Sequence, residues 1–317
     1  MDLIFWVGFI LFIGVFLALD LGVFHRKAHI VPPKEALAWT VVWVTLAVIF
    51  GIGVLAWRGA ETGIAWFTGY VIEYSLSVDN VFVFALVFGA FAVPRELQHR
   101  VLFWGVVGAL VLRFVMILAG AELIERYHWV IYAFGAFLVF TGVRMALSRG
   151  GHAEHPEDNI LVRVARKRLR VVPEFHGQKF FIRTAAGLAA TPLFLTLITV
   201  ETTDVIFAVD SIPAIFAVTT DPFVVFTSNA FAILGLRSLY FLLADAADRF
   251  RYLKMGLAVV LIFVGAKMLL SDILKIPPVI SLVVIIGVLA ASVVASLMAD
   301  RRERANGGFA TEELEQG

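Results

Sequence analysis

Three carboxylates stand close together in a segment that is otherwise apolar enough to cross a membrane. The segment spans residues 201–213, reads ETTDVIFAVDSIP, and contains Glu201, Asp204 and Asp210. An acidic residue at the middle of a bilayer costs roughly 3 kcal/mol on insertion scales. Such groups persist when something binds them, and a cation is the natural partner. The stretch therefore predicts a cation site within the membrane.

A second acidic stretch resembles the first. SVDNVFVFALVF at 77–88 aligns with AVDSIPAIFAVT at 208–219, and each aspartate has another acid six residues before it. Because each matched unit has three apolar segments, the second must enter the membrane from the opposite side, as in transporters built from inverted repeats. The aligned pairs are Glu73 with Asp204, Asp79 with Asp210, Asn80 with Ser211, Arg113 with Arg237, and Arg144 with Lys267.

Oxygen atoms dominate the polar groups within these segments. Carboxylate and amide oxygens suit a hard divalent ion such as Mn²⁺, Mg²⁺ or Ca²⁺, whereas copper and zinc prefer sulfur or imidazole. The alternative is that the acids only pair with Arg113 and Arg237, but two bases cannot neutralise six acids. The candidate metal ligands are Asp79, Asp210, Glu73, Asp204, Glu201, Asn80 and Asp20.

The spacing within each acidic stretch raises a geometric problem. Residues six apart in a straight helix diverge by about 120° around its axis. We therefore expect the helices of segments 64–91 and 186–218 to be broken, the second near Pro192 and Pro213. Breaks of this kind would let Asp79 and Asp210 face each other across one pocket.

The composition indicates a membrane protein. The 317 residues are 61% hydrophobic and 16% charged, the net charge is +1, and the mean hydropathy is +0.91. No soluble domain needs this much apolar surface. The chain has no cysteine, which removes disulfides, thiolate ligands and iron–sulfur clusters. No phosphate-binding loop motif is present, so we expect no ATPase within the chain. We also expect no other enzyme activity and no resident cofactor.

Nine apolar runs are long enough to cross a bilayer, and they predict an all-α, polytopic helix bundle in a single membrane domain. The expected units are two N-terminal spans (1–57), repeat 1 (64–148), a basic loop (149–185), repeat 2 (186–272), a last span (278–299) and a cytoplasmic tail (300–317). We expect the polar part of the tail after Arg304 to be disordered. The nine runs are 3–24, 37–57, 64–91, 101–121, 129–148, 186–218, 223–243, 254–272 and 278–299.

Lysine and arginine set the expected orientation. If the chain crosses nine times, nineteen of the 26 basic residues fall on one side and three on the other. The basic side faces the cytoplasm, so the N-terminus lies outside and the C-terminus inside. The stretch RVARKRLR at 163–170 fits a cytoplasmic anchor, and an interfacial helix on anionic lipid is one form it takes. Nucleic acid is not an expected partner, and the oligomeric state is left open.

The chain resembles the TerC family, and within it the Alx-like branch of bacterial inner-membrane proteins. The resemblance is carried by ALDLGVFHRK (18–27), EYSLSVDNVFVFAL (73–86), ETTDVIFAVDSIPAIFAV (201–218) and the basic loop. It implies an exporter of Mn²⁺ related to the LysE-type exporters, with the acids of these motifs as ligands. Manganese as the cargo rests on this resemblance alone.

Other functions stay open. The family is also associated with tellurium resistance and with a membrane-bound redox role, although the missing cysteines and the absence of histidine from the centre of any span count against the redox role. A purely structural role for the acids and the export of organic cations or amino acids are further alternatives. Protons are the expected exchange partner for the metal, because buried carboxylates bind both.

Overall fold

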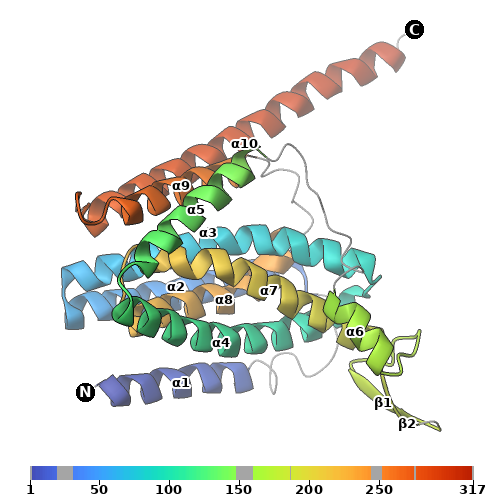
Figure 1. Ribbon diagram of the computed structural model, residues 1–317. Coiled ribbons are helices and arrows are strands. Elements are labelled where there is room, and N and C mark those ends of the chain that lie inside the picture. The colour runs from blue at the N-terminus through green and yellow to red at the C-terminus, as the bar shows by residue number, and fades with distance from the viewer. Residues whose placement is uncertain are drawn as a thin grey trace.

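The computed structural model describes residues 2–19, 31–147, 160–185, 187–243, 252–274 and 276–315. Within these ranges the chain forms ten helices and one two-stranded hairpin (Figure 1). The helices are α1 (Asp2–Leu19), α2 (Pro33–Arg58), α3 (Ala60–Ala90), α4 (Arg95–Arg126), α5 (Val130–Leu147), α6 (Ile160–Arg168), α7 (Pro192–Phe216), α8 (Pro222–Leu243), α9 (Leu253–Leu269) and α10 (Pro278–Glu315), and the strands are β1 (Phe181–Thr184) and β2 (Gly187–Ala190).

The predicted class of all-α membrane bundle is confirmed. Each of the nine apolar runs contains one helix, and seven helices of the described ranges are long and apolar enough to cross a membrane. The apolar part of α1, Ile4–Ala18, is shorter, and α9 has 17 residues. The structure therefore shows a multi-pass membrane protein, and the total of nine spans stays a prediction.

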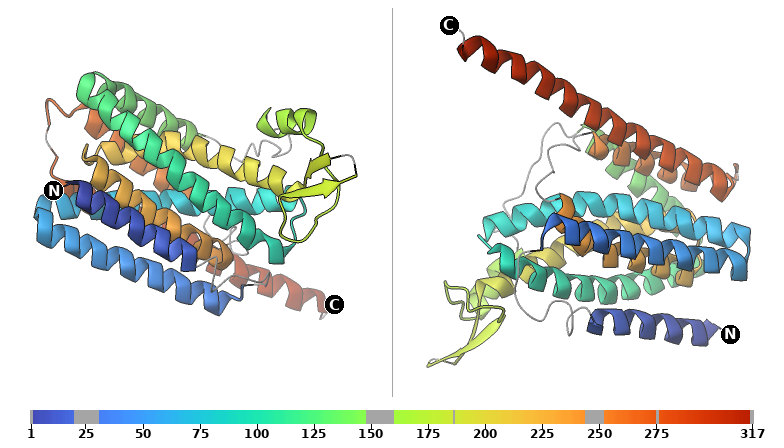
Figure 2. Two further views of the ribbon diagram at one scale, coloured as in Figure 1. Left: turned by 90° about the horizontal axis from the view of Figure 1, so that it is seen from below. Right: turned by 180° about the vertical axis from the view of Figure 1, so that it is seen from behind.

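Helix α8 forms the centre of the bundle. Almost all of its residues are buried, and it packs against α2, α3 and α4. An aromatic cluster closes the space between α1 and α8: Trp6 stacks on Phe226, and Phe9 contacts Phe226 and Phe231. Figure 2 shows α1 and α10 on opposite sides of the bundle. Large aliphatic side chains on α1, α2 and α10 face outward, as lipid-facing helices require.

Helices α5 and α9 cross at very close range. A Cβ atom on Gly135 would lie 2.9 Å from the carbonyl oxygen of Gly265, and one on Gly142 would lie 2.8 Å from that of Ala258. In the sequence repeat, Gly142 aligns with Gly265 and position 135 with position 258. A two-fold axis through the crossing would therefore exchange the two contacts. The two contacts agree with the alignment of the repeat, and the inverted repeat itself stays a prediction.

The expected breaks in two helices are wrong. α3 runs without interruption through 31 residues, and α7 through 25. Pro192 is the first residue of α7, where its missing N–H costs nothing, and Pro213 lies in the last turn. At about 1.5 Å per residue α3 is about 47 Å long, so tilting and extension into the headgroup layer account for its length.

The first residues of the predicted run 186–218 belong to the hairpin and not to a span. β1 pairs antiparallel with β2, from Phe181 opposite Ala190 to Thr184 opposite Gly187. Gly187 has a φ of +111°, a conformation that favours glycine. Thr191 donates a hydrogen bond to the carbonyl of Lys179 and ends the hairpin directly before α7.

The basic loop contains the helix α6. Its small apolar residues Val162 and Ala165 are buried, it packs against α7, and its arginines point outward. In Figure 1, α6, the hairpin and the C-terminus lie at one end of the bundle and the N-terminus at the other. The tail expected to lack structure instead continues α10 to Glu315, because alanine, arginine and glutamate in this stretch favour helix.

Candidate functional site: a buried cluster of carboxylates around Arg113

Arg113 of α4 lies at the centre of the bundle and is 1% exposed. Its Nε and Nη2 donate to the two carboxylate oxygens of Asp204 on α7, at 3.1 and 2.9 Å. Its Nη1 donates to Oε1 of Glu73 on α3 in a short ion pair. One guanidinium thus joins two carboxylates from the two aligned acidic stretches, and we call these three residues the central triad.

Two neutral groups complete the contacts of Arg113. Nη1 lies 3.3 Å from the hydroxyl of Ser211 on α7 and 3.4 Å from the amide oxygen of Asn229 on α8. The planar fork of an arginine can serve this many acceptors because it carries five N–H donors. The cluster therefore ties α3, α4, α7 and α8 together at one point.

The two carboxylates of the central triad can accept more hydrogen bonds than the guanidinium donates to them. With all three groups ionised, two carboxylates and one guanidinium leave one negative charge in a buried place. Oε2 of Glu73 is buried and has no hydrogen-bond partner among the described residues, and neither has the amide nitrogen of Asn229. Burial of unbalanced charge is costly, so such an arrangement persists when a further positive group can reach it.

Glu201 adds a third carboxylate beside the triad. It lies three residues before Asp204 on α7, and the two carboxylates interact electrostatically. Its carboxylate packs against the backbone of α4 where Gly108 has no side chain, and a Cβ there would overlap it. Oε2 of Glu201 is also buried without a hydrogen-bond partner in the described ranges. With Glu201 also ionised, three carboxylates stand near the single guanidinium of Arg113.

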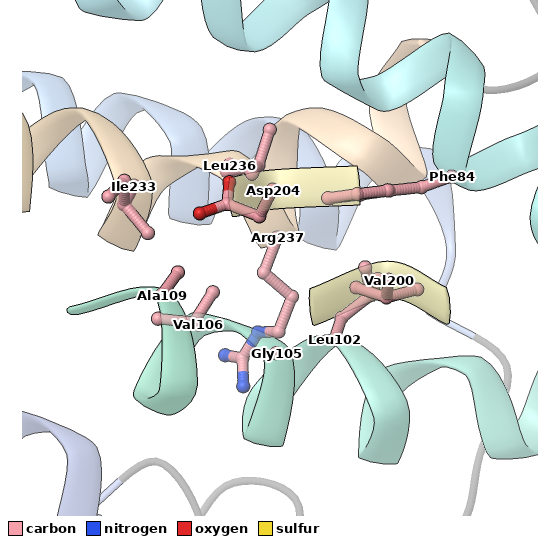
Figure 3. Close-up of a pocket in the computed structure, with 10 residues that line it drawn as sticks. All are labelled: Phe84, Leu102, Gly105, Val106, Ala109, Val200, Asp204, Ile233, Leu236 and Arg237. Atoms are coloured by element: carbon pink, nitrogen blue, oxygen red, sulfur yellow. The ribbon is translucent and has the colours of Figure 1, made fainter. Parts of the chain in front are cut away.

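A small cavity adjoins Asp204. Its volume of about 10 Å³ holds roughly one water molecule, and α3, α4, α7 and α8 line it. Figure 3 shows the residues around it, with Arg237 of α8 extending toward α4 near Gly105 and away from the carboxylate of Asp204. Arg237 is the sequence counterpart of Arg113, whose guanidinium bonds to both Glu73 and Asp204.

Asp79 and Asp210 do not join the triad. Asp210 accepts a hydrogen bond of 3.3 Å from Thr141 of α5 and interacts electrostatically with Arg144. Asp79 has Lys254, the second residue of α9, as its electrostatic partner. The two aspartates therefore face different helices and different basic residues.

The antiparallel packing of α3 and α7 explains this separation (Figure 1). Glu73 and Asp204 lie opposite each other at Arg113, and each aspartate follows six residues later on its own helix. Six residues along two opposed helices separate Asp79 and Asp210 by about 18 Å along the bundle. The structure brings together Glu73, Asp204 and, beside them, Glu201, and it places the two aspartates toward opposite ends.

The remaining candidates contribute less. Asn80 is buried in α3 but is not a partner of Arg113, and Asp20 lies outside the described residues. Within the described ranges no three histidine, aspartate or glutamate side chains stand close enough to hold a metal ion in this conformation. Metal binding by the seven candidate residues thus stays a prediction.

The sequence missed two features of this site. The packing of Glu201 on Gly108 depends on how α4 approaches α7, and no motif marks it. Thr141 is one of many threonines in apolar segments, so its bond to Asp210 has no signal in the sequence. By contrast, the rarity of arginine in spans did mark Arg113 as a counter-charge.

The fold and the site define a polytopic helical membrane protein with a cluster of carboxyl groups around a buried arginine at its centre. Comparison with known proteins agrees: residues 58–304 match the family described as "Integral membrane protein TerC family". The chain belongs to the TerC family.

Its relatives cover almost the whole chain. It is 55% identical to "Uncharacterized membrane protein STKORF319" of Myxococcus xanthus, over 93% of this chain and 92% of that protein. It is 49% identical to "Putative membrane-bound redox modulator Alx" of Escherichia coli K12, over 96% of this chain and 97% of that protein. A membrane protein of Rickettsia bellii is 40% identical over 92% of this chain and 97% of its own length. No solved structure matches.

Proposed function

We propose that this protein is a secondary transporter that exports a hard divalent cation, Mn²⁺ foremost, from the cytoplasm across the bacterial inner membrane. The observation that carries the proposal is that three carboxyl groups, those of Glu73, Asp204 and Glu201, gather around Arg113 inside the bundle. When all three are ionised, their charge exceeds that of Arg113, and Arg237, which lines the adjoining cavity, can balance at most one more negative charge. A transported cation is the simplest group to balance them, and the proposal assigns the chain transport and no catalytic activity.

In this proposal Arg113 is the resident counter-ion of the site. The oxygen atoms that accept hydrogen bonds from Arg113 belong to carboxylate, hydroxyl and amide groups. As metal ligands, such oxygens suit a hard cation better than a soft one. An arriving divalent ion competes with the guanidinium for Glu73 and Asp204. When the ion leaves, Arg113 returns and prevents the acids from remaining unpaired, so the empty carrier stays stable.

Asp79 and Asp210 fit a role on either side of this centre. They follow the central acids along opposed helices, one toward each end of the bundle, as the inverted repeat requires. Each is partly buried and lies near a basic residue. We assign them to the approach and the exit of the cation, with the N-terminus outside and the basic α6 end in the cytoplasm. Protons are the proposed exchange partner, because carboxylates that release a metal bind them.

Metal flux in proteoliposomes tests the proposal. Purified protein is reconstituted, and entry of Mn²⁺, Ca²⁺ and Mg²⁺ is followed with an enclosed indicator at two pH gradients. Glu73→Gln and Asp204→Asn keep the shape of the side chains and remove one charge each, so both are expected to abolish Mn²⁺ flux.

Asp221→Asn is the matched control. Asp221 is also an acid paired with an arginine, Arg58, but it is partly exposed and lies at the start of α8. Its side chain accepts a hydrogen bond from the backbone N–H of Phe223, and an asparagine side chain can accept the same bond. This variant is expected to keep full flux. Flux that persists in correctly folded Glu73→Gln and Asp204→Asn, or flux lost equally in the control, contradicts the proposal.

A redox role is the second candidate, because the Escherichia coli relative carries that name. It requires a bound group that accepts electrons. An absorption spectrum of the purified protein between 300 and 700 nm decides between the transporter and the redox protein. A redox protein is expected to carry on the order of one chromophore per chain. A stoichiometric haem or flavin band, together with unchanged Mn²⁺ flux in the carboxylate variants, would favour this candidate.

A further inference from the structure

A second cavity lies far from the central triad, at the end of the bundle where α3 begins. It has a volume of about 270 Å³ and is open to the surroundings. The start of α3, the end of α7, the end of α9 and the start of α10 all contribute to it, and Ile131 and Phe216 form part of an apolar wall. Because it lies at the ends of the apolar helices, we expect it to lie at the level of the lipid headgroups.

One positive side chain enters this cavity. Lys267 of α9 lines it, is partly buried, and donates a hydrogen bond of 2.9 Å to the hydroxyl of Ser281. Within the described part of the chain no carboxylate lies within ion-pair distance of Lys267; Ser281 is its one partner there. A partly buried ammonium with a single neutral partner is poorly compensated, because it has two further donors.

Two other features of the cavity favour an anion. Ser271 lines it, and its hydroxyl oxygen is buried and has no hydrogen-bond partner among the described residues. The cavity also includes Pro278, the first residue of α10. The beginning of a helix this long carries a partial positive charge. Its backbone donors contribute little here, because Pro277 and Pro278 have no N–H and the N–H groups of Ile280 and Ser281 bond to the carbonyl of Pro277. An ammonium, a hydroxyl and a helix N-terminus thus converge on one volume.

We propose that this cavity binds a phosphate-type oxyanion on Lys267, Ser271 and the start of α10, independently of the proposed cation transport. The volume of the cavity and the apolar side chains of Ile131 and Phe216 beside Lys267 fit the phosphate of an anionic phospholipid, with the apolar part of the lipid next to these two side chains. Free inorganic phosphate shares the same chemistry. Glu61 is the acid on the rim and opposes an anion, so its charge limits the affinity.

The test counts bound lipid by native mass spectrometry. The protein is purified with phosphatidylglycerol, washed with lipid-free detergent, and compared with Lys267→Met, Ser271→Ala and Glu61→Gln. Loss of the charged partner is expected to weaken retention about tenfold in Lys267→Met. Ser271→Ala is expected to weaken it less, and Glu61→Gln to strengthen it, which a merely misfolded variant could not do.

A second arm uses inorganic phosphate alone and measures the thermal unfolding temperature of delipidated protein. If phosphate raises the unfolding temperature of the original protein but not that of Lys267→Met, and no lipid is retained, the oxyanion site is supported and its ligand is a free anion. The proposal is overturned if the original protein and the three variants retain lipid equally and if phosphate changes the unfolding temperatures of the original protein and of Lys267→Met alike. Unfolding temperatures of the variants without any ligand show that each is folded.

Discussion

Replacing Arg113 by methionine is the sharpest test of the central triad. Methionine has a similar length and no charge, so it leaves Glu73 and Asp204 buried without their shared cation. The substitution removes a two-pronged contact at 2.9 and 3.1 Å and a second ion pair at once. Breaking a buried pair in this way costs about 3–5 kcal/mol, because an uncompensated charge stays behind.

A triple variant separates charge from packing. Glu73→Gln, Arg113→Met and Asp204→Asn together keep the volumes of the side chains but remove all three charges. Since removing a whole buried pair is often close to neutral, this variant is expected to recover most of the stability that Arg113→Met loses. The effects of the single changes are therefore expected to be strongly non-additive.

Thermal unfolding in detergent provides the assay. The seven tryptophans give an intrinsic fluorescence signal. A loss of 3–5 kcal/mol is expected to lower the unfolding temperature of Arg113→Met by on the order of 10 °C. Arg113→Met as stable as the original protein, or a triple variant as unstable as the single one, would refute the reasoning that charge couples these residues.

The same variant tests the cation proposal. Without the guanidinium, a divalent ion meets no competitor at Glu73 and Asp204. Mn²⁺ at a hundred times its dissociation constant is expected to stabilise Arg113→Met by about 2.7 kcal/mol, and the original protein by less. No effect of Mn²⁺ on either protein would count against the ion, while leaving the ion pairs themselves intact.

Three further substitutions concern glycines. Gly108→Ala places a methyl group on the carboxylate of Glu201 and is expected to cost about 1–3 kcal/mol and to reduce Mn²⁺ flux, as unfolding and flux assays can show. Gly135→Ala brings a Cβ to 2.9 Å from the carbonyl oxygen of Gly265, so α5 and α9 must separate, at a similar cost in unfolding free energy. A Cβ at Gly53 in α2 meets nothing within 4 Å, so Gly53→Ala is expected to raise the free energy of unfolding by up to about 1 kcal/mol, since alanine favours helix. A loss of stability comparable to that of the other two variants would contradict the steric argument.

Much of the fold followed from local patterns. The nine apolar runs each contain a helix because hydrocarbon forces a backbone to satisfy its hydrogen bonds within the segment. The basic stretch at 163–170 overlaps the helix α6 at one end of the bundle. The breaks expected at Pro192 and Pro213 were wrong, since a proline costs little at the first residue of a helix and interrupts few bonds in the last turn.

The amino-acid sequence by itself determined that this chain spans a membrane, and that acids and arginines must meet inside it. Only the tertiary structure decided which of them meet. Glu73 and Asp204 share Arg113, while Asp79 and Asp210 face α9 and α5. The physical reason is direction: α3 and α7 run antiparallel, so residues that follow the central acids by equal steps move apart. The sequence gives the spacing of six residues within each helix, but it does not give the relative direction of the two helices.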